Sequence, residues 1–103
     1  MTWFLEVRQE AAEDIHASSE WYAQQQSGLE ERFLADLDQC YAFILRNPMG
    51  PARISGPYRQ SRLSKFPFHV VYMVIGDMVL VMRVYHMKRD DRRKLKFRSR
   101  RRT

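Results

Sequence analysis

Residues 68–86, which read FHVVYMVIGDMVLVMRVYH, are predicted to form two strands joined by a tight turn. Residues 68–75 are almost all apolar and rich in β-branched side chains, which favours a central strand covered on both faces. Gly76 and Asp77 then suit a two-residue turn of the primed type, which joins antiparallel strands. Residues 78–86 are therefore expected to form the partner strand. Because Gly76, Asp77 and Arg83 interrupt the apolar run, we expect a β-hairpin and not a membrane span.

Residues 10–26 and 29–46 are predicted to form an antiparallel helix hairpin. Apolar side chains recur at spacings of three and four residues in both stretches, which is typical of helices with one buried face. In the first stretch this stripe consists of Ala12, Ile15, Ser19 and Tyr22. Gly28 suits a left-handed C-cap of the first helix, and Pro48 ends the second. Because about two residues separate the helices, they must fold back on each other.

The remaining segments complete an α+β fold. Residues 3–8 alternate apolar and polar side chains and predict a short strand. Residues 49–57 are rich in glycine and proline and predict a loop, whereas residues 58–64 predict another strand. The expected order is β-α-α-β-β-β, with an N-terminal strand, the helix hairpin and a three-stranded antiparallel meander. We expect a single domain over residues 1–93 and a basic tail over residues 94–103.

The composition favours one small cytoplasmic domain. The chain has 103 residues, of which 45% are hydrophobic and 29% are charged, as in ordinary globular domains. Its only cysteine, Cys40, excludes an intrachain disulfide and fits a reducing compartment. The N-terminus has acidic residues and no long apolar run, so we expect no signal peptide.

Charge is distributed unevenly along the chain. Residues 1–50 carry three basic and nine acidic side chains, whereas residues 88–103 carry ten basic and two acidic side chains. The net charge of +6 therefore hides an acidic first half and a basic C-terminal end. A basic end of this kind favours binding to nucleic acid or to an acidic protein segment.

Four segments, in this order, resemble the RelE/ParE superfamily of toxins. They are LADLDQCYAFILRNPMG at residues 34–50, RQSRLSKFPFHVVYMV at 59–74, VLVMRVYH at 79–86 and HMKRDDRR at 86–93. Together they correspond to the end of the helix hairpin, the arginine-bearing strand with its phenylalanine-proline turn, the second strand of the hairpin and the basic segment after it. The resemblance covers nearly the whole chain, from Phe4 to about Arg93.

The resemblance implies a toxin that a cognate antitoxin holds inactive. The antitoxin would be a small, partly disordered protein with an acidic tail that wraps the sheet and the basic surface. One branch of the superfamily is a ribosome-dependent endoribonuclease that cuts mRNA in the ribosomal A site, and the ParE branch blocks DNA gyrase. The long helix hairpin and the lack of a tyrosine after Tyr85 favour the ParE-like branch. The alternatives are a RelE-type ribonuclease, a decayed toxin and a non-toxic basic module that binds nucleic acid, so enzymatic activity is left open.

Cleavage of RNA by its 2′-hydroxyl needs a base, an acid and cations that stabilise the phosphorane. By position in the superfamily, the catalytic candidates are Arg62, His69, His86 and Arg89. If Leu63 points into the core, Arg62 faces away from it. Further basic side chains are expected to contact nucleic acid or the antitoxin: Arg59, Arg83, Lys88, Arg92, Arg93 and Lys94. Because Arg83 interrupts an apolar strand, it needs a partner or an open face.

No cofactor or metal site is predicted. The three histidines and Cys40 do not have the spacing of metal ligands. The chain also has no glycine-rich loop of the kind that cradles phosphates. The expected partners are therefore an antitoxin and either gyrase or the ribosome with its mRNA, with no membrane and no small-molecule cofactor.

Overall fold

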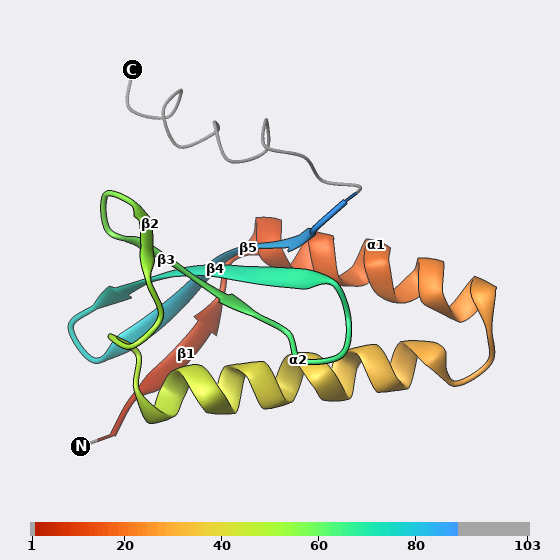
Figure 1. Cartoon of the computed structure of the whole chain (residues 1–103), viewed down its shortest axis with the longest axis horizontal. Coiled ribbons are helices and arrows are strands. Elements are labelled where there is room, and N and C mark those ends of the chain that lie inside the picture. The colour runs from red at the N-terminus through yellow and green to blue at the C-terminus, as the bar shows by residue number, and fades with distance from the viewer. Residues whose placement is uncertain (1, 89–103) are drawn as a thin grey trace.

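Two helices cover one face of a five-stranded sheet in the computed structural model, which describes residues 2–88 (Figure 1). The elements are β1 (Phe4–Val7), α1 (Gln9–Gln25), α2 (Leu29–Arg46), β2 (Arg53–Ser55), β3 (Tyr58–Arg62), β4 (Phe68–Ile75) and β5 (Met78–His86). The strand order is β1-β5-β4-β3-β2. Strand β1 runs parallel to β5, and the other pairs are antiparallel. The predicted α+β fold, with a helix hairpin and an antiparallel meander, is confirmed.

The main core lies between the helices and the sheet. Helix α2 contributes its apolar stripe, and alternate residues of the strands face it. The largest fully buried side chains there are Phe33, Ile44, Leu63, Phe68, Val70, Tyr72, Val79, Val81 and Val84. Tyr72 also donates its hydroxyl hydrogen to the carbonyl oxygen of Pro48 at 2.6 Å. This contact joins the end of α2 to the centre of the sheet.

Two predictions about the helix hairpin were wrong in detail. Ala11, not Ala12, is buried beneath α1, so the buried stripe of this helix starts one residue earlier. Gly28 has the expected left-handed backbone, with φ of 84°, but it stands at the N-cap of α2, and Gln26 is the C-cap of α1. A left-handed residue at this point reverses the chain between the two helices, whichever helix it caps.

Strand β2 lies within residues 49–57, which had been predicted as a loop, and β3 ends at Arg62 and not at residue 64. The guanidinium of Arg59 donates hydrogen bonds to the carbonyl oxygens of Met49 and Pro51, at 2.9 and 2.7 Å. These bonds hold the segment beside β3, where it forms a short strand. The strand depends on a side chain of its neighbour, so local composition did not reveal it.

A β-bulge in β5 decides which side chains reach each face of the sheet. The two-residue turn at Gly76, which has φ of 60°, pairs Ile75 with Met78. The register then shifts: Tyr72 pairs with Val81, but Val71 pairs with Arg83. Met82 is therefore the extra residue of the bulge. Beyond it, each side chain of β5 lies on the face opposite to the one that an unbroken hairpin would give it.

An acidic side chain of α1 covers the edge of β5 beyond the end of β1. Asp14 accepts hydrogen bonds from Nε and Nη2 of Arg83 at 2.8 and 2.9 Å, and from the backbone N–H of Val84 at 3.0 Å. The two side chains are about one-sixth exposed. This bidentate pair fixes α1 against the sheet.

Within residues 2–88, neither helix combines the length and the apolar character that a membrane crossing requires. The predicted domain boundary at residue 93 and the tail at 94–103 lie outside the described residues, so both stay predictions.

Candidate functional site

The face of the sheet opposite the helices is called here the open face. Its centre is a small apolar cluster in which Val71 and Tyr85 are buried, with Ile54, Tyr58 and Met82 packed against them. No helix contributes to this cluster among the residues that the structure describes. The open face is therefore where strand residues can meet a partner.

Arg62, His69 and Tyr85 form a row across three neighbouring strands of the open face. Arg62 of β3 pairs in register with His69 of β4, and His69 pairs with Tyr85 of β5. Arg62 is exposed, His69 is half-buried and Tyr85 is only 4% exposed. The structure therefore brings two of the four catalytic candidates, Arg62 and His69, side by side.

The surroundings of His69 favour its neutral form. Burial lowers the pKa of His69 below its ordinary value of 6.5, and the positive charge of Arg62 lowers it further. A neutral imidazole can accept a proton at neutral pH. Arg62 donates a hydrogen bond from Nη1 to Sδ of Met87 at 3.0 Å. The pair thus offers a proton acceptor beside a guanidinium.

Arg83 lies on the open face but is held by an acid. Besides its bidentate bonds to Asp14, its guanidinium lies over the ring of Tyr85, with 5.4 Å between its Cζ atom and the ring centroid. This arrangement covers the Tyr85 ring and compensates the charge of Arg83. The expectation that Arg83 needs a partner is met by Asp14.

His86 lies on the other face of the sheet. Its ring packs edge-on against Phe68, with 5.0 Å between the ring centroids, and its Nδ1 accepts a hydrogen bond from the backbone N–H of Lys88 at 3.0 Å. Because Phe68 belongs to the core beneath the helices, His86 is separated by the sheet from His69. The two histidines do not form one site.

The remaining predicted contact residues divide into three groups. Arg59 donates hydrogen bonds to the carbonyl oxygens of Met49 and Pro51, so its guanidinium binds the segment before β2. Lys88 is exposed just after β5. Four of the predicted residues lie outside the described part of the chain: Arg89, Arg92, Arg93 and Lys94.

Tyr85 is a site residue that the sequence reasoning missed. An unbroken hairpin from the turn at Gly76 would have paired Tyr85 with Phe68 and turned it toward the helices. One signal could have revealed its true side. Alternation of buried residues through Val81 would place Arg83 in the core, and the apolar pattern resumes at Val84. A charged residue at a core position followed by this change of phase indicates a bulge.

The end of the open face near the Gly76 turn carries large apolar side chains of the strands, with three charged residues beside them. A hollow of about 320 Å³ is lined there by side chains of β3, β4 and β5 and by residues that follow β1. They are Arg8, Glu10, Tyr58, Met73, Ile75, Leu80, Met82 and Arg83. Phe4 and Ile75 are large apolar side chains that stay more than half exposed. The open face thus combines an apolar half with the polar row at Arg62.

A metal centre is not built into this face. Within residues 2–88, no three histidine, cysteine, aspartate or glutamate side chains gather closely enough to hold a metal ion.

Comparison with known proteins identifies the family of this chain. Residues 5–91 match the family described as the ParE toxin of the type II toxin-antitoxin system parDE. The chain belongs to this ParE toxin family. No curated protein matches its sequence.

Solved structures share the architecture of this ParE-family chain. A chain of the chromosomal ParDE system from P. aeruginosa superposes with a TM-score of 0.66 at 22% identity, over 84% of this chain and 98% of that one. A chain of the RelBE2 complex from Mycobacterium tuberculosis has a TM-score of 0.60 at 18% identity, over 84% and 100%. The isolated RelE toxin from E. coli has a TM-score of 0.55 at 18% identity, over 95% and 97%. At these identities the likeness establishes the fold.

Proposed function

We propose that this ParE-family chain is a toxin that a cognate antitoxin neutralises, and that it acts in the cytoplasm by binding DNA gyrase and not by cutting mRNA. The family match supports the ParE side, and two of the similar structures, RelBE2 from Mycobacterium tuberculosis and RelBE from E. coli, are toxin-antitoxin complexes. The observation that carries the choice is the chemistry of the open face.

The polar row offers an incomplete set of groups for RNA cleavage. His69 can act as a base and Arg62 can stabilise negative charge. Tyr85, which pairs in register with His69, could donate a proton, but it is 4% exposed and its ring is covered by the Arg83 guanidinium. His86 is on the other side of the sheet. Cleavage by the 2′-hydroxyl also requires an acid opposite the base, and neither Tyr85, which is buried, nor His86, which lies on the other face, is placed to supply it.

The apolar half of the open face favours a protein target. Clustered apolar side chains on an exposed surface mark sites of protein contact, whereas a face that binds RNA needs cations and stacking platforms. The hollow beside Leu80 and Met82 is of the kind that contacts proteins, and Phe4 and Ile75 add exposed apolar side chains at the turn end of the sheet. Such a surface suits an enzyme subunit such as gyrase better than a phosphate backbone.

The test combines growth with two biochemical readouts. Induction of the chain without an antitoxin should arrest bacterial growth, and the purified chain should inhibit gyrase supercoiling while ribosome-bound mRNA stays intact. Leu80→Glu should abolish gyrase inhibition, whereas Arg53→Glu, an exposed change on β2, should leave it unchanged. Full supercoiling activity in the presence of a folded, growth-arresting chain would overturn the proposal.

A ribonuclease is the second candidate, because Arg62 and His69 stand side by side. It predicts codon-positioned cuts in mRNA on ribosomes that disappear in both Arg62→Ala and His69→Gln. Cuts that depend on these two residues would favour this candidate over gyrase binding.

A further inference from the structure

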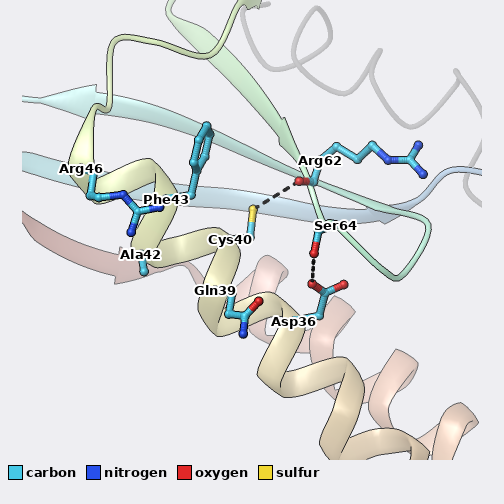
Figure 2. Close-up of a pocket in the computed structure, with 8 residues that line it drawn as sticks. All are labelled: Asp36, Gln39, Cys40, Ala42, Phe43, Arg46, Arg62 and Ser64. Carbon is cyan, nitrogen blue, oxygen red and sulfur yellow. Dashed lines mark hydrogen bonds between the residues drawn. The ribbon is translucent and has the colours of Figure 1, made fainter.

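A second surface, separate from the open face, runs along the outer side of α2. Two adjoining hollows of about 490 and 340 Å³ share Asp36 and Gln39 among their lining residues. We call them together the α2–β3 groove. The first hollow lies between α2 and the end of β3, as Figure 2 shows, and the second continues along α2 beside Lys65 and Phe66. Neither hollow includes a residue of the open-face hollow.

The floor of the α2–β3 groove is apolar and closed. Cys40 is 6% exposed, and its Sγ lies 3.9 Å from the carbonyl oxygen of Arg62, so the helix is sealed against the strand (Figure 2). Ala42 and Phe43 form one wall, and the Phe43 ring is 53% exposed beside the cavity. A large aromatic side chain held at the wall of a cavity is an anchor point for an apolar side chain of a partner.

The two ends of the groove are cationic. Arg46 lies at one end, with its Cζ atom 5.9 Å from the centroid of the Phe43 ring, and Arg32 and Lys65 line the other end. All three side chains are exposed, and none of them makes an ion pair within residues 2–88. Arg62 adds its backbone to the wall, while its guanidinium extends away from α2 (Figure 2).

The carboxylate that lines the groove is already satisfied. Asp36 accepts hydrogen bonds from the Ser64 hydroxyl at 2.9 Å and from the backbone N–H groups of Lys65 and Phe66, both at 2.8 Å. Burial raises the pKa of Asp36, but these hydrogen bonds outweigh it and hold the pKa below 3.8. Asp36 therefore supports the loop between β3 and β4 and does not neutralise the cations at the ends of the groove.

We propose that the α2–β3 groove binds an extended, acidic segment of the antitoxin that has an apolar centre and acidic side chains at both ends. From Arg32 to Arg46 the helix rises by roughly 21 Å, which six or seven residues of extended chain would span. The apolar side chains would rest on Ala42 and Phe43, and the acidic ends would meet Arg46 on one side and Arg32 with Lys65 on the other. Nucleic acid fits less well, because the Asp36 carboxylate lines both hollows where they meet and would repel phosphate groups. This inference rests on the proposed function, since it takes the antitoxin as the partner.

A peptide probe tests the groove directly. The probe is a fluorescein-labelled peptide with two glutamates at each end and leucine, valine and leucine between them, added to the full chain. We expect Arg46→Glu and Lys65→Glu each to weaken its Kd by about fivefold, and the double variant by about 25-fold. Arg53→Glu makes the same change in net charge on β2, outside the groove, and should leave the Kd within about twofold. Amide NMR shifts caused by the probe should cluster at Gln39, Cys40 and Phe43.

Several results would overturn the proposal that the α2–β3 groove binds the antitoxin segment. Shifts that map to the open face around Tyr58 and Leu80 would do so, as would equal effects of Arg46→Glu and Arg53→Glu. A single-stranded oligothymidylate that displaces the peptide from the groove at equal concentration would point to nucleic acid. Growth arrest separates this inference from the proposed function. If the chain is toxic but the peptide does not bind in the groove, only the proposed binding site is refuted. If the chain is harmless but binds the peptide there, only the toxin assignment is refuted.

Discussion

Replacement of Asp14 by alanine should destabilise the protein more than any change at an exposed position of α1. The side chain of Asp14 accepts three hydrogen bonds, two from Arg83 and one from the N–H of Val84. Alanine would leave a guanidinium that is only 17% exposed without its counter-ion, and a strand N–H without its acceptor. The helix would also lose its polar attachment to β5.

The magnitude follows from burial. Removing one partner of a fully buried ion pair costs about 3–5 kcal/mol, because the remaining charge stays in the protein. Water reaches this pair in part, so we expect the free energy of unfolding to fall by about 2–4 kcal/mol, the hydrogen bond to Val84 included. For a domain of this size that loss lowers Tm by roughly 10–25 °C. Since small domains are stable by about 5–15 kcal/mol, the variant should still fold at room temperature.

Urea denaturation followed by circular dichroism measures the effect. Glu13→Ala is the matched control, because Glu13 directly precedes Asp14 on α1, is exposed and accepts a hydrogen bond from Gln9 at 3.1 Å; it should change stability by about 0.5 kcal/mol or less. In a double-mutant cycle with Arg83→Leu, the interaction energy should be about 1–3 kcal/mol. If Asp14→Ala costs no more than Glu13→Ala, the account of the edge of β5 is refuted.

Three further measurements address the loop, the histidine and the bulge. Asp36→Asn should lower the free energy of unfolding at neutral pH by about 1–3 kcal/mol. Because the folded-state pKa of Asp36 is lowered, its contribution to stability is present above pH 3.8 and is lost as the pH falls further. In urea titrations at a series of pH values, the stability of the variant should therefore fall less steeply at acidic pH than that of the parent chain. Equal slopes at acidic pH would contradict this. Arg62→Gln should raise the pKa of His69 toward 6.5 in an NMR titration of the ring, and an unchanged value would show that burial alone sets it. Deletion of Met82, the extra residue of the bulge, should keep cooperative unfolding, because the unbroken ladder still pairs Val71 with Arg83 and keeps both Val81 and Val84 beneath the helices; loss of cooperative unfolding would show that the bulge itself is required.

The regular elements could be predicted because their patterns are local. The apolar periodicity of α2 and the runs on each side of the Gly76 turn placed three elements at the bounds that the structure has. The position of Arg62 also followed from alternation, since Leu63 is fully buried and Arg62 is exposed. In each case the information lies within a few residues of the side chain concerned.

The parts that could not be predicted depend on contacts between distant residues. Strand β2 pairs with β3, and Arg59 of β3 binds the carbonyl oxygens of Met49 and Pro51 before it, contacts that composition does not encode. The pairing of Asp14 with Arg83 joins residues 69 positions apart. The resemblance to the superfamily makes both His69 and His86 catalytic candidates, but the register of β5 puts them on opposite faces.

The bulge at Met82 links the packing of the core to the composition of the open face. Val79, Val81 and Val84 all bury fully beneath the helices, and strict alternation cannot place both Val81 and Val84 on one face. One extra residue after Val81 resolves the conflict. The same shift carries Arg83 out of the core to Asp14 and turns Tyr85 toward His69. The packing of the β5 valines in the core therefore determines which side chains of β5 join Arg62 and His69 on the open face. A substitution that changes this packing should also change the open face.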